Sequence, residues 1–219
     1  GGMPRLGIAM SGSTATRVHE QRSSPRPPVS KQLARVTAKQ LIPHIRALAE
    51  SLQSASKLHL RREANLVRRE MAGDQAPGEP HLLIAGLALA AEAFRRAVNV
   101  TLYDVQLLAA IAMSRRCIAQ MRTGEGRTFA VLTATLHLAL TRRGVHVITP
   151  NEYLAARDYE IAAIVAEPLG ITLALLPRRL DIVEKTAAYD ADITYGTAYE
   201  FGCDYLRDQL ALRERSRQC

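Results

Sequence analysis

The apolar positions at the start of the chain change from no period to a helical period near residue 30. Residues 1–30 are rich in Ser, Pro, Gly and Arg, which predicts a disordered basic leader. Between residues 31 and 71 apolar side chains recur at spacings typical of one helix face, at Leu33, Val36, Leu41, Ile45 and Leu48. These residues are predicted to form a helical N-terminal extension. Pro43 is expected to break or kink it, because proline lacks an N–H group.

The rest of the chain alternates between helical and strand patterns. Residues 72–80 are dense in Gly and Pro and are predicted to be a linker to a second domain, residues 81–219. Its first segment, 81–98, is predicted to be a packed helix, because its apolar run is shorter than the roughly 20 residues that cross a bilayer. The expected strands are 116–121, 145–149, 171–176 and 191–197, and the expected helices are 127–144, 151–170 and the segment from Tyr199 onward. This alternation predicts an α/β fold, a parallel sheet flanked by helices.

Composition and charge indicate the size of the core, the redox compartment and the type of partner. The chain has 219 residues, 47% of them hydrophobic, so it can build a sizeable core, although it contains no Trp. Three separated cysteines favour a reducing compartment over a disulfide framework or a zinc site. Residues 1–70 carry 13 Lys/Arg against 4 Asp/Glu, so the excess positive charge of the chain lies there. This asymmetry suggests an acidic partner, such as anionic lipid or nucleic acid, or a solvated basic tail without a partner.

One stretch combines glycines with the start of a helix, "IAQMRTGEGRTFAV" at residues 118–131. Gly124 and Gly126 carry no Cβ, so the backbone can approach an anion and present its N–H groups. The following helix directs the positive end of its dipole at the same point, and the Thr128 hydroxyl is suited to a phosphate-bound Mg²⁺. The phosphate-loop template is met in part, because Arg127 replaces its lysine. A nucleotide site and a glycine turn that merely starts a helix both remain open at this point.

Three stretches of the sequence resemble one family. They are "YDVQLLAAIAMSRRCIAQMRTGEGRT", "GVHVITPNEYLAARDYE" and "ADITYGTAYEFGCDYLRDQL". They are similar, in order and spacing, to the nucleotide-binding domain of SecA, the preprotein translocase motor ATPase. The similarity spans about residues 81–210.

The resemblance implies a P-loop NTPase fold of the RecA/helicase type, with ATP or ADP and Mg²⁺ as ligands. It implies that Gln106 reads adenine, that Tyr103 lies beside the base, and that Thr128 serves the metal. The implied phosphate loop consists of Met121, Thr123, Gly124, Glu125, Gly126, Arg127 and Thr128. Asp104 is expected to be the N-cap of the helix that contains Gln106. The implied partners are a preprotein and a membrane translocation channel, at a cytoplasmic site peripheral to the inner membrane. Anionic lipid could be bound through residues 1–70.

The departures from the family pattern keep other interpretations open. Besides Arg127, the family's Asn-Asn pair is Ala198-Tyr199 here, and the family's acidic Mg²⁺-binding motif does not occur in these 219 residues. The nucleotide-binding domain is therefore expected to be incomplete, with an unpaired sheet edge and without ATP turnover of its own. One alternative is a degenerate, non-hydrolytic scaffold or regulator. Another is a helicase-like module, although the match at residues 191–208 disfavours nucleic acid as the partner.

Overall fold

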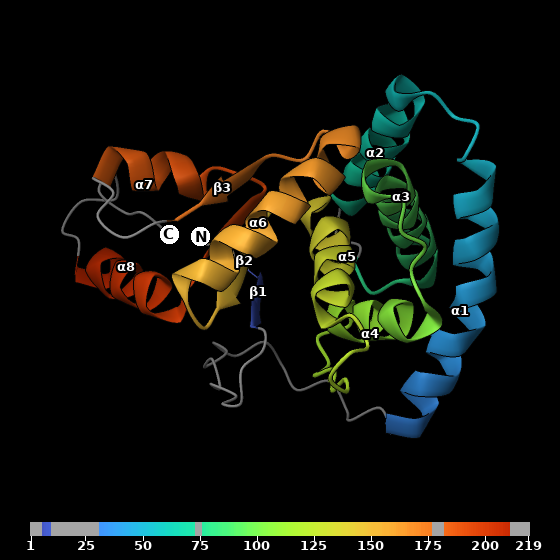
Figure 1. Cartoon of the computed structure of the whole chain (residues 1–219), viewed down its shortest axis with the longest axis horizontal. Helices are drawn as coiled ribbons and strands as arrows, with labels where there is room; N and C mark the ends of the chain where they lie inside the picture. Colours follow the sequence, from blue (N-terminus) through green and yellow to red (C-terminus); the bar gives the residue numbers. More distant parts are fainter. Residues whose placement is uncertain (1–5, 10–30, 73–75, 177–181, 211–219) are drawn as a thin grey trace.

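The computed structural model describes residues 6–9, 31–72, 76–176 and 182–210. Helices α1 (Lys31–Ser51), α2 (Lys57–Met71), α3 (Pro80–Val98) and α4 (Asp104–Ser114) precede α5 (Arg127–Ala139). They pack together at one end of the molecule, beside the sheet (Figure 1). The sheet consists of β1 (Leu6–Ala9), β2 (Val145–Thr149), β3 (Leu173–Leu175) and β4 (Ile193–Thr197). Helix α6 (Glu152–Ala166) with the short 3₁₀ turn η1 (Glu167–Leu169), α7 (Ile182–Tyr189) and α8 (Ala198–Leu210) complete the described part.

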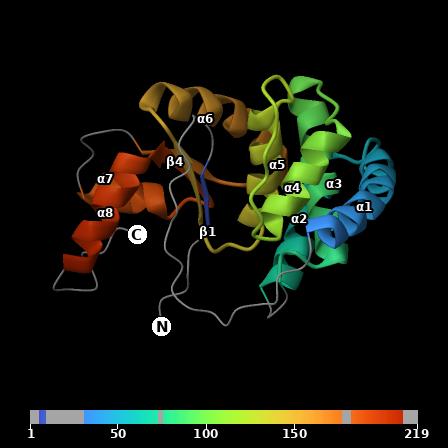
Figure 2. The same cartoon turned by 90° about the horizontal axis from the view of Figure 1, so that it is seen from below.

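The four described strands are parallel and lie in the order β1-β2-β4-β3. Helices α5 and α6 cover one face of this sheet, and α7 and α8 cover the other (Figure 2). Every residue of β4 is buried, whereas all three residues of β3 are partly exposed. The difference follows from position, because β4 lies between two strands and β3 lies at an edge of the described sheet. The α/β fold with a parallel sheet flanked by helices is confirmed.

The alternation of side chains along the strands divides the core between the two faces. Val145, Val147, Ile193 and Tyr195 belong to one large cluster that extends through α3, α4 and α5 to α1 and α2. Ile148 and its neighbours on the other face pack in a small cluster formed by Leu176, Ala188, Tyr189 and Phe201. Because α1 and α2 share the large cluster, their apolar faces are buried against the same core as the helix after the glycine loop.

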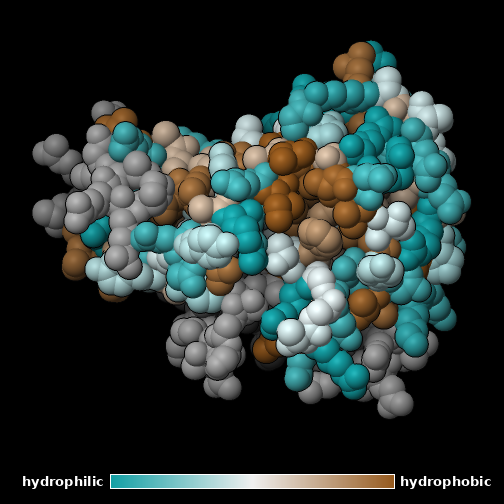
Figure 3. All heavy atoms as spheres, in the orientation of Figure 1, coloured by the Kyte–Doolittle hydropathy of each residue, from teal (hydrophilic) through white to brown (hydrophobic). Residues whose placement is uncertain are grey.

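Hydrophilic and apolar side chains are unevenly distributed over the surface of the molecule. In the view of Figure 3 the side of the molecule formed by α1 is mostly hydrophilic, and apolar side chains show near the junction of α3, α5 and α6. Ile164 on α6 is 56% exposed. Within the described residues, we find no helix that is both long and apolar enough to span a membrane.

Three features differ from the sequence-based predictions. Residues 6–9, within the segment predicted to be disordered, form β1 and pair with β2, from Leu6 opposite Val145 to Ala9 opposite Ile148; the rest of 1–30 lies outside the described residues. Helix α1 continues through Pro43 instead of breaking there, held by the burial of residues on both sides such as Ile42 and Ile45.

The third difference concerns the segment before the glycine loop. Residues 116–121 were predicted to be a strand, but they have no regular structure. Ile118 is 99% exposed and Cys117 is also exposed. A strand is stabilised when its apolar side chains pack against neighbouring side chains, and an apolar side chain in solvent does not do so. The short apolar pattern therefore did not identify a strand here. The glycine loop therefore follows α4 through an irregular connection.

Candidate nucleotide site

The glycine loop, residues 121–126, connects this irregular segment to the N-terminus of α5. Gly126 is the N-cap of α5 with φ 75°, and Gly124 has φ 90°. Both angles lie in the left-handed region, which glycine adopts without a steric penalty. A Cβ on Gly126 would lie 2.2 Å from Nε2 of Gln106, whereas a Cβ on Gly124 would meet nothing within 4 Å. Gly126 is therefore required by its conformation and by the close approach of α4, and Gly124 by its conformation.

Backbone N–H groups accumulate at the start of α5 without protein partners. Within the described residues, the N–H groups of Gly124, Gly126, Arg127 and Thr128 donate to no protein acceptor. The first turn of any helix leaves such donors free, and α5 with its 13 residues adds the positive end of its dipole. Free donors in a glycine turn at a helix N-terminus are the arrangement that binds phosphate in proteins.

Gln106 connects α4 to this loop. Its side chain is only 3% exposed. Its Oε1 accepts a hydrogen bond from the backbone N–H of Tyr103 (2.9 Å), and its Nε2 donates to the backbone carbonyl of Glu125 (3.2 Å). An amide group offers two donor hydrogens and two acceptor lone pairs, so one of each is not used by these two hydrogen bonds. The structure thus gives Gln106 a contact with the loop that the sequence did not predict.

The other predicted site residues lie around the loop with different exposures. The ring of Tyr103 is 71% exposed, so its face is accessible to a planar ligand. Thr123 is exposed, Met121 is partly exposed, and the Glu125 carboxylate accepts a hydrogen bond from the N–H of Arg122 (2.8 Å), which closes the turn. Tyr103 is the N-cap of α4 and Asp104 is its first residue, so the prediction of Asp104 as the N-cap was wrong. Asp104 pairs instead with Arg46 of α1.

Arg127 and Thr128 form the first two positions of α5. Both are partly exposed, and within the described part of the chain the Arg127 guanidinium takes part in no ion pair. Its charge is therefore available to an external anion rather than neutralised inside the protein. No three His, Cys, Asp or Glu side chains of the described residues gather into a metal-binding group, and the Thr128 hydroxyl lies in the first turn of α5.

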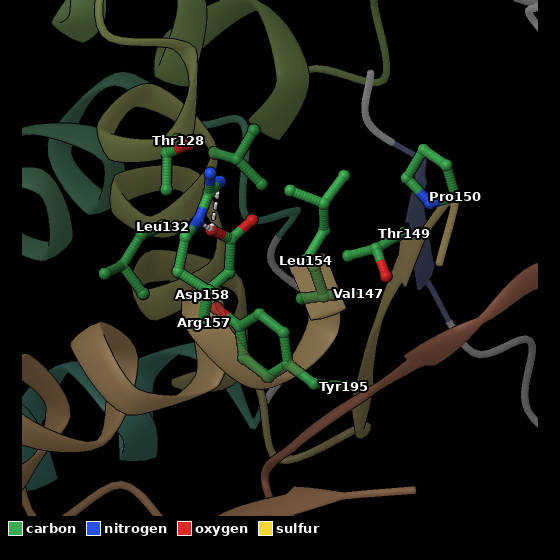
Figure 4. A pocket seen from close by; sticks show the side chains of 10 residues that line it. Thr128, Leu132, Val147, Thr149, Pro150, Leu154, Arg157, Asp158 and Tyr195 are labelled. Atoms are coloured by element: carbon green, nitrogen blue, oxygen red, sulfur yellow. Dashed lines mark hydrogen bonds and ion pairs between the residues drawn. The ribbon is translucent and has the colours of Figure 1, made fainter. Parts of the chain in front are cut away.

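A small hollow lies beside the loop. It is bordered by the start of α5, the carboxyl end of β2 and one side of α6 (Figure 4). Its volume is about 40 Å³, which is room for one or two waters and far less than a nucleotide needs. A nucleotide at this loop would therefore rest on the surface, with at most a small group reaching the hollow. Its lining consists of Thr128, Val131, Leu132, Val147, Thr149, Pro150, Leu154, Arg157, Asp158 and Tyr195.

The polar groups of the hollow are the hydroxyls of Thr128, Thr149 and Tyr195 and the Arg157–Asp158 pair of α6. Arg157 donates to the carboxylate of its neighbour Asp158 through Nε (3.0 Å) and Nη2 (2.7 Å), and both side chains point toward Thr128 (Figure 4). Burial, with a contribution from the charge of Asp158, raises the pKa of Tyr195, so this phenol stays neutral. The hollow therefore carries one internally paired charge couple and three neutral hydroxyl groups.

Apart from Thr128, sequence reasoning missed the residues of the hollow, and it also missed Arg46. Arg157 and Asp158 follow the strand at 145–149 by less than three helical turns, so their place near the carboxyl end of a parallel strand was a usable signal. Arg46 is separated from Asp104 by 58 positions, and Arg46 lies outside the three stretches that resemble the family. Only the packing of α1 against the loop region brings them together.

The parallel α/β sheet flanked by helices is consistent with part of a RecA-like DEAD domain. Comparison with known families agrees, because the model of the SecA DEAD-like domain matches residues 28–218. The chain belongs to this SecA family.

Its relatives include the protein translocase subunits SecA of three bacteria. The subunit of Carboxydothermus hydrogenoformans is 41% identical over 184 residues, covering 84% of this chain and 20% of the relative. That of Buchnera aphidicola is 38% identical over 182 residues, 82% of this chain and 20% of the relative. That of Wigglesworthia glossinidia brevipalpis is 46% identical over 138 residues, 63% of this chain and 16% of the relative. The chain thus spans about a fifth of the length of these relatives.

Proposed function

We propose that this chain is the ATP-binding portion of a SecA-like motor that drives preprotein export across the inner membrane. The observation that carries the proposal is the group of unpartnered N–H donors between Gly124 and Thr128, at the N-terminus of α5. These donors and the positive helix end suit the phosphate tail of a nucleotide. Family membership and the SecA names of the relatives support the same role.

The residues present suit a bound nucleotide in distinct ways. Gly124, Gly126 and the first turn of α5 would hold the phosphates, and the Arg127 guanidinium would add a fixed positive charge. The remaining donor and acceptor of Gln106 suit the edge of adenine, and the exposed Tyr103 ring suits stacking on the base. The Thr128 hydroxyl would be a ligand of a phosphate-bound Mg²⁺, which would neutralise phosphate charge when bound.

Equilibrium titration of the full chain with a fluorescent ADP or ATP analogue, with and without Mg²⁺, tests the proposal. Gly124→Ala places a side chain at φ 90° in the proposed phosphate cradle, where its Cβ meets no neighbour, so it strains the loop without a steric clash. The matched control is Gly202→Ala in α8, where the added Cβ also meets nothing and φ is not left-handed. We expect at least tenfold weaker binding for the first variant and unchanged binding for the control. Absence of binding by the wild-type chain at millimolar Mg-ATP would refute the proposal.

The roles that belong to a whole translocase extend this proposal. We infer that the chain acts with a preprotein and a membrane translocation channel, in the cytoplasm at the periphery of the inner membrane. The excess of Lys and Arg in residues 1–70 suits contact with anionic lipid headgroups. Cosedimentation with vesicles of phosphatidylglycerol, compared with pure phosphatidylcholine, tests the lipid contact. Equal pelleting with both vesicles, or none with either, would contradict it.

Arg127 supports a second candidate, a non-hydrolytic SecA-like scaffold or regulator. A guanidinium is longer and more planar than the lysine ammonium, so it can hold phosphate while placing charge differently from what transfer chemistry needs. Nucleotide binding without turnover by the full-length protein, with turnover appearing in Arg127→Lys, would favour the scaffold. Turnover in the wild-type protein would exclude it.

A further inference from the structure

Helix α1 is fixed to the helices around the candidate site by apolar packing and by two arginines. Ile42 and Ile45 are buried in the large core cluster. At the end of α1, Arg96 of α3 donates to the backbone carbonyls of Leu52 (2.8 Å) and Ala55 (2.6 Å), in the turn that leads to α2. The end of α1 is therefore held in place by α3, and the middle of the helix by a different contact.

Arg96 is itself oriented by Glu92, one turn earlier on α3. The Glu92 side chain is 1% exposed and receives hydrogen bonds from Arg95 and Arg96. Burial alone would raise the pKa of Glu92, but these hydrogen bonds outweigh burial and lower the pKa. The carboxylate stays ionised and keeps the Arg96 guanidinium directed at the carbonyls after α1.

The middle of α1 contacts the residues that begin α4. Arg46 donates through Nε to the carboxylate of Asp104 (3.1 Å) and through Nη2 to the same carboxylate and to the backbone carbonyl of Leu102 (3.1 Å). Leu102 is 3% exposed. One guanidinium thus spans both sides of Tyr103, and the fork of donors that this requires is specific to arginine.

The hydrogen bonds continue from these residues into the glycine loop. The N–H of Tyr103, between the two residues that Arg46 holds, donates to Gln106, and Gln106 donates to the carbonyl of Glu125. Glu125 adjoins Gly126, whose close approach to Gln106 leaves no room for a side chain. A shift of residues 102–104 would therefore move Gln106 relative to the loop.

We propose that Arg46 is a positioning residue that couples helix α1 to the nucleotide site through Tyr103 and Gln106. It fixes the start of α4, and the start of α4 fixes the Gln106 amide that supports the loop and faces the base. The inference rests on the proposed nucleotide binding for its effect on affinity, whereas its effect on loop order is independent of any ligand. Because the Arg46 and Asp104 side chains are 38% and 64% exposed, the coupling is moderate and weakens with salt.

Arg46→Ala in the full chain tests the coupling, with Arg62→Ala as the matched control. Arg62 is an exposed arginine of α2 that bonds to no described residue. The first measurement is amide hydrogen exchange without nucleotide. We expect Arg46→Ala to accelerate exchange in residues 103–107 and 122–130 while residues 193–210 keep the wild-type rate, and Arg62→Ala to change none of them. Equal exchange of both variants in 122–130 would overturn the proposal.

The second measurement is the affinity for ADP and for GDP at low salt. Arg46→Ala is expected to weaken ADP binding about three- to tenfold and GDP binding less, because the displaced group is the one that faces the base. Arg46→Lys keeps the charge without the fork and is expected to fall between Arg46→Ala and wild type. An unchanged ADP affinity in Arg46→Ala would overturn the proposed coupling to nucleotide. If the wild-type chain bound no nucleotide, the proposed function would fail, and the exchange experiment alone would decide whether Arg46 orders the loop.

Discussion

The buried histidine of α5 predicts a loss of stability in mild acid. His137 is 0% exposed, and its Nε2 lies 2.8 Å from the backbone carbonyl of Pro77, which fits an Nε2–H donor. Its Nδ1 has no hydrogen-bond partner among the described residues, and the absence of a side chain on Gly86 makes room for the ring, since a Cβ there would lie 2.1 Å from Nδ1. Burial lowers the pKa of His137 from 6.5 to about 4, a change that the hydrogen bond to Pro77 only partly opposes.

The sign of the pH effect follows from this lowered pKa. In the unfolded chain His137 takes up a proton near pH 6.5, whereas in the folded chain it does so only near pH 4. Between these values the unfolded state binds more protons, so the free energy of unfolding decreases as pH falls. The full loss attributable to His137 is about 3 kcal/mol below pH 4, and about 2 kcal/mol is already lost at pH 5.

Urea unfolding followed by circular dichroism at pH 7.5 and pH 5.0 measures this loss. His137→Leu removes the titrating group and keeps a side chain of similar size, so its decrease between the two pH values should be about 2 kcal/mol smaller than that of wild type. His59→Gln, at an exposed position of α2, is the control and should behave as wild type does. Equal pH dependence of wild type and His137→Leu would show that the ring is not buried in its neutral form, and would refute the reasoning.

Three further predictions concern buried groups outside the loop. Lys185→Met should lower the free energy of unfolding by about 3–5 kcal/mol in urea titration, because Lys185 is 2.7 Å from Asp204 and 2.9 Å from Glu200, and both carboxylates are buried. The exposed Lys57→Met should cost less than about 1 kcal/mol, and equal losses would contradict this. Gly86→Ala should lower the melting temperature, and His137→Ala in the same chain should recover part of the loss by removing the ring that the new Cβ meets; additive losses would contradict this. Glu92→Gln should lower the free energy of unfolding more at pH 7 than at pH 3. The pKa of Glu92 is lower in the folded chain than in the unfolded chain, so its carboxylate stabilises the fold above the unfolded pKa, and this stabilisation is lost as pH falls. A pH-independent effect would contradict this.

Local sequence patterns correctly predicted the strands and helices in which the spacing of apolar residues matches the spacing of buried side chains. The strand at 145–149 has the predicted bounds, and the Asn151 side chain caps the next helix by accepting from the N–H of Leu154. The buried strand at 193–197 also lies within its predicted segment. The glycines of the loop were identifiable because their left-handed backbone angles are a local requirement. In each case the determinant lies within a few residues of the position that it determines.

The predictions that failed depended on partners distant in sequence. The apolar pattern of 116–121 resembled a strand, but none of the described strands pairs with it, and Ile118 remains in solvent. Residues 6–9 lie in a polar leader without a period and nevertheless pair with β2. Strand formation requires a pairing partner as well as a pattern, and the pattern alone cannot supply that information.

By itself the sequence determined the fold class, the family and the residues of the glycine loop, because repeat periods, caps and motifs are encoded over short stretches. Tertiary structure alone decided that Gln106 supports the loop through Glu125, that Arg46 bonds to Asp104, 58 positions further along the chain, and that His137 is buried against Gly86. These contacts depend on the packing of whole helices against one core. That packing is a collective property of many apolar side chains, so no single stretch of the sequence records it.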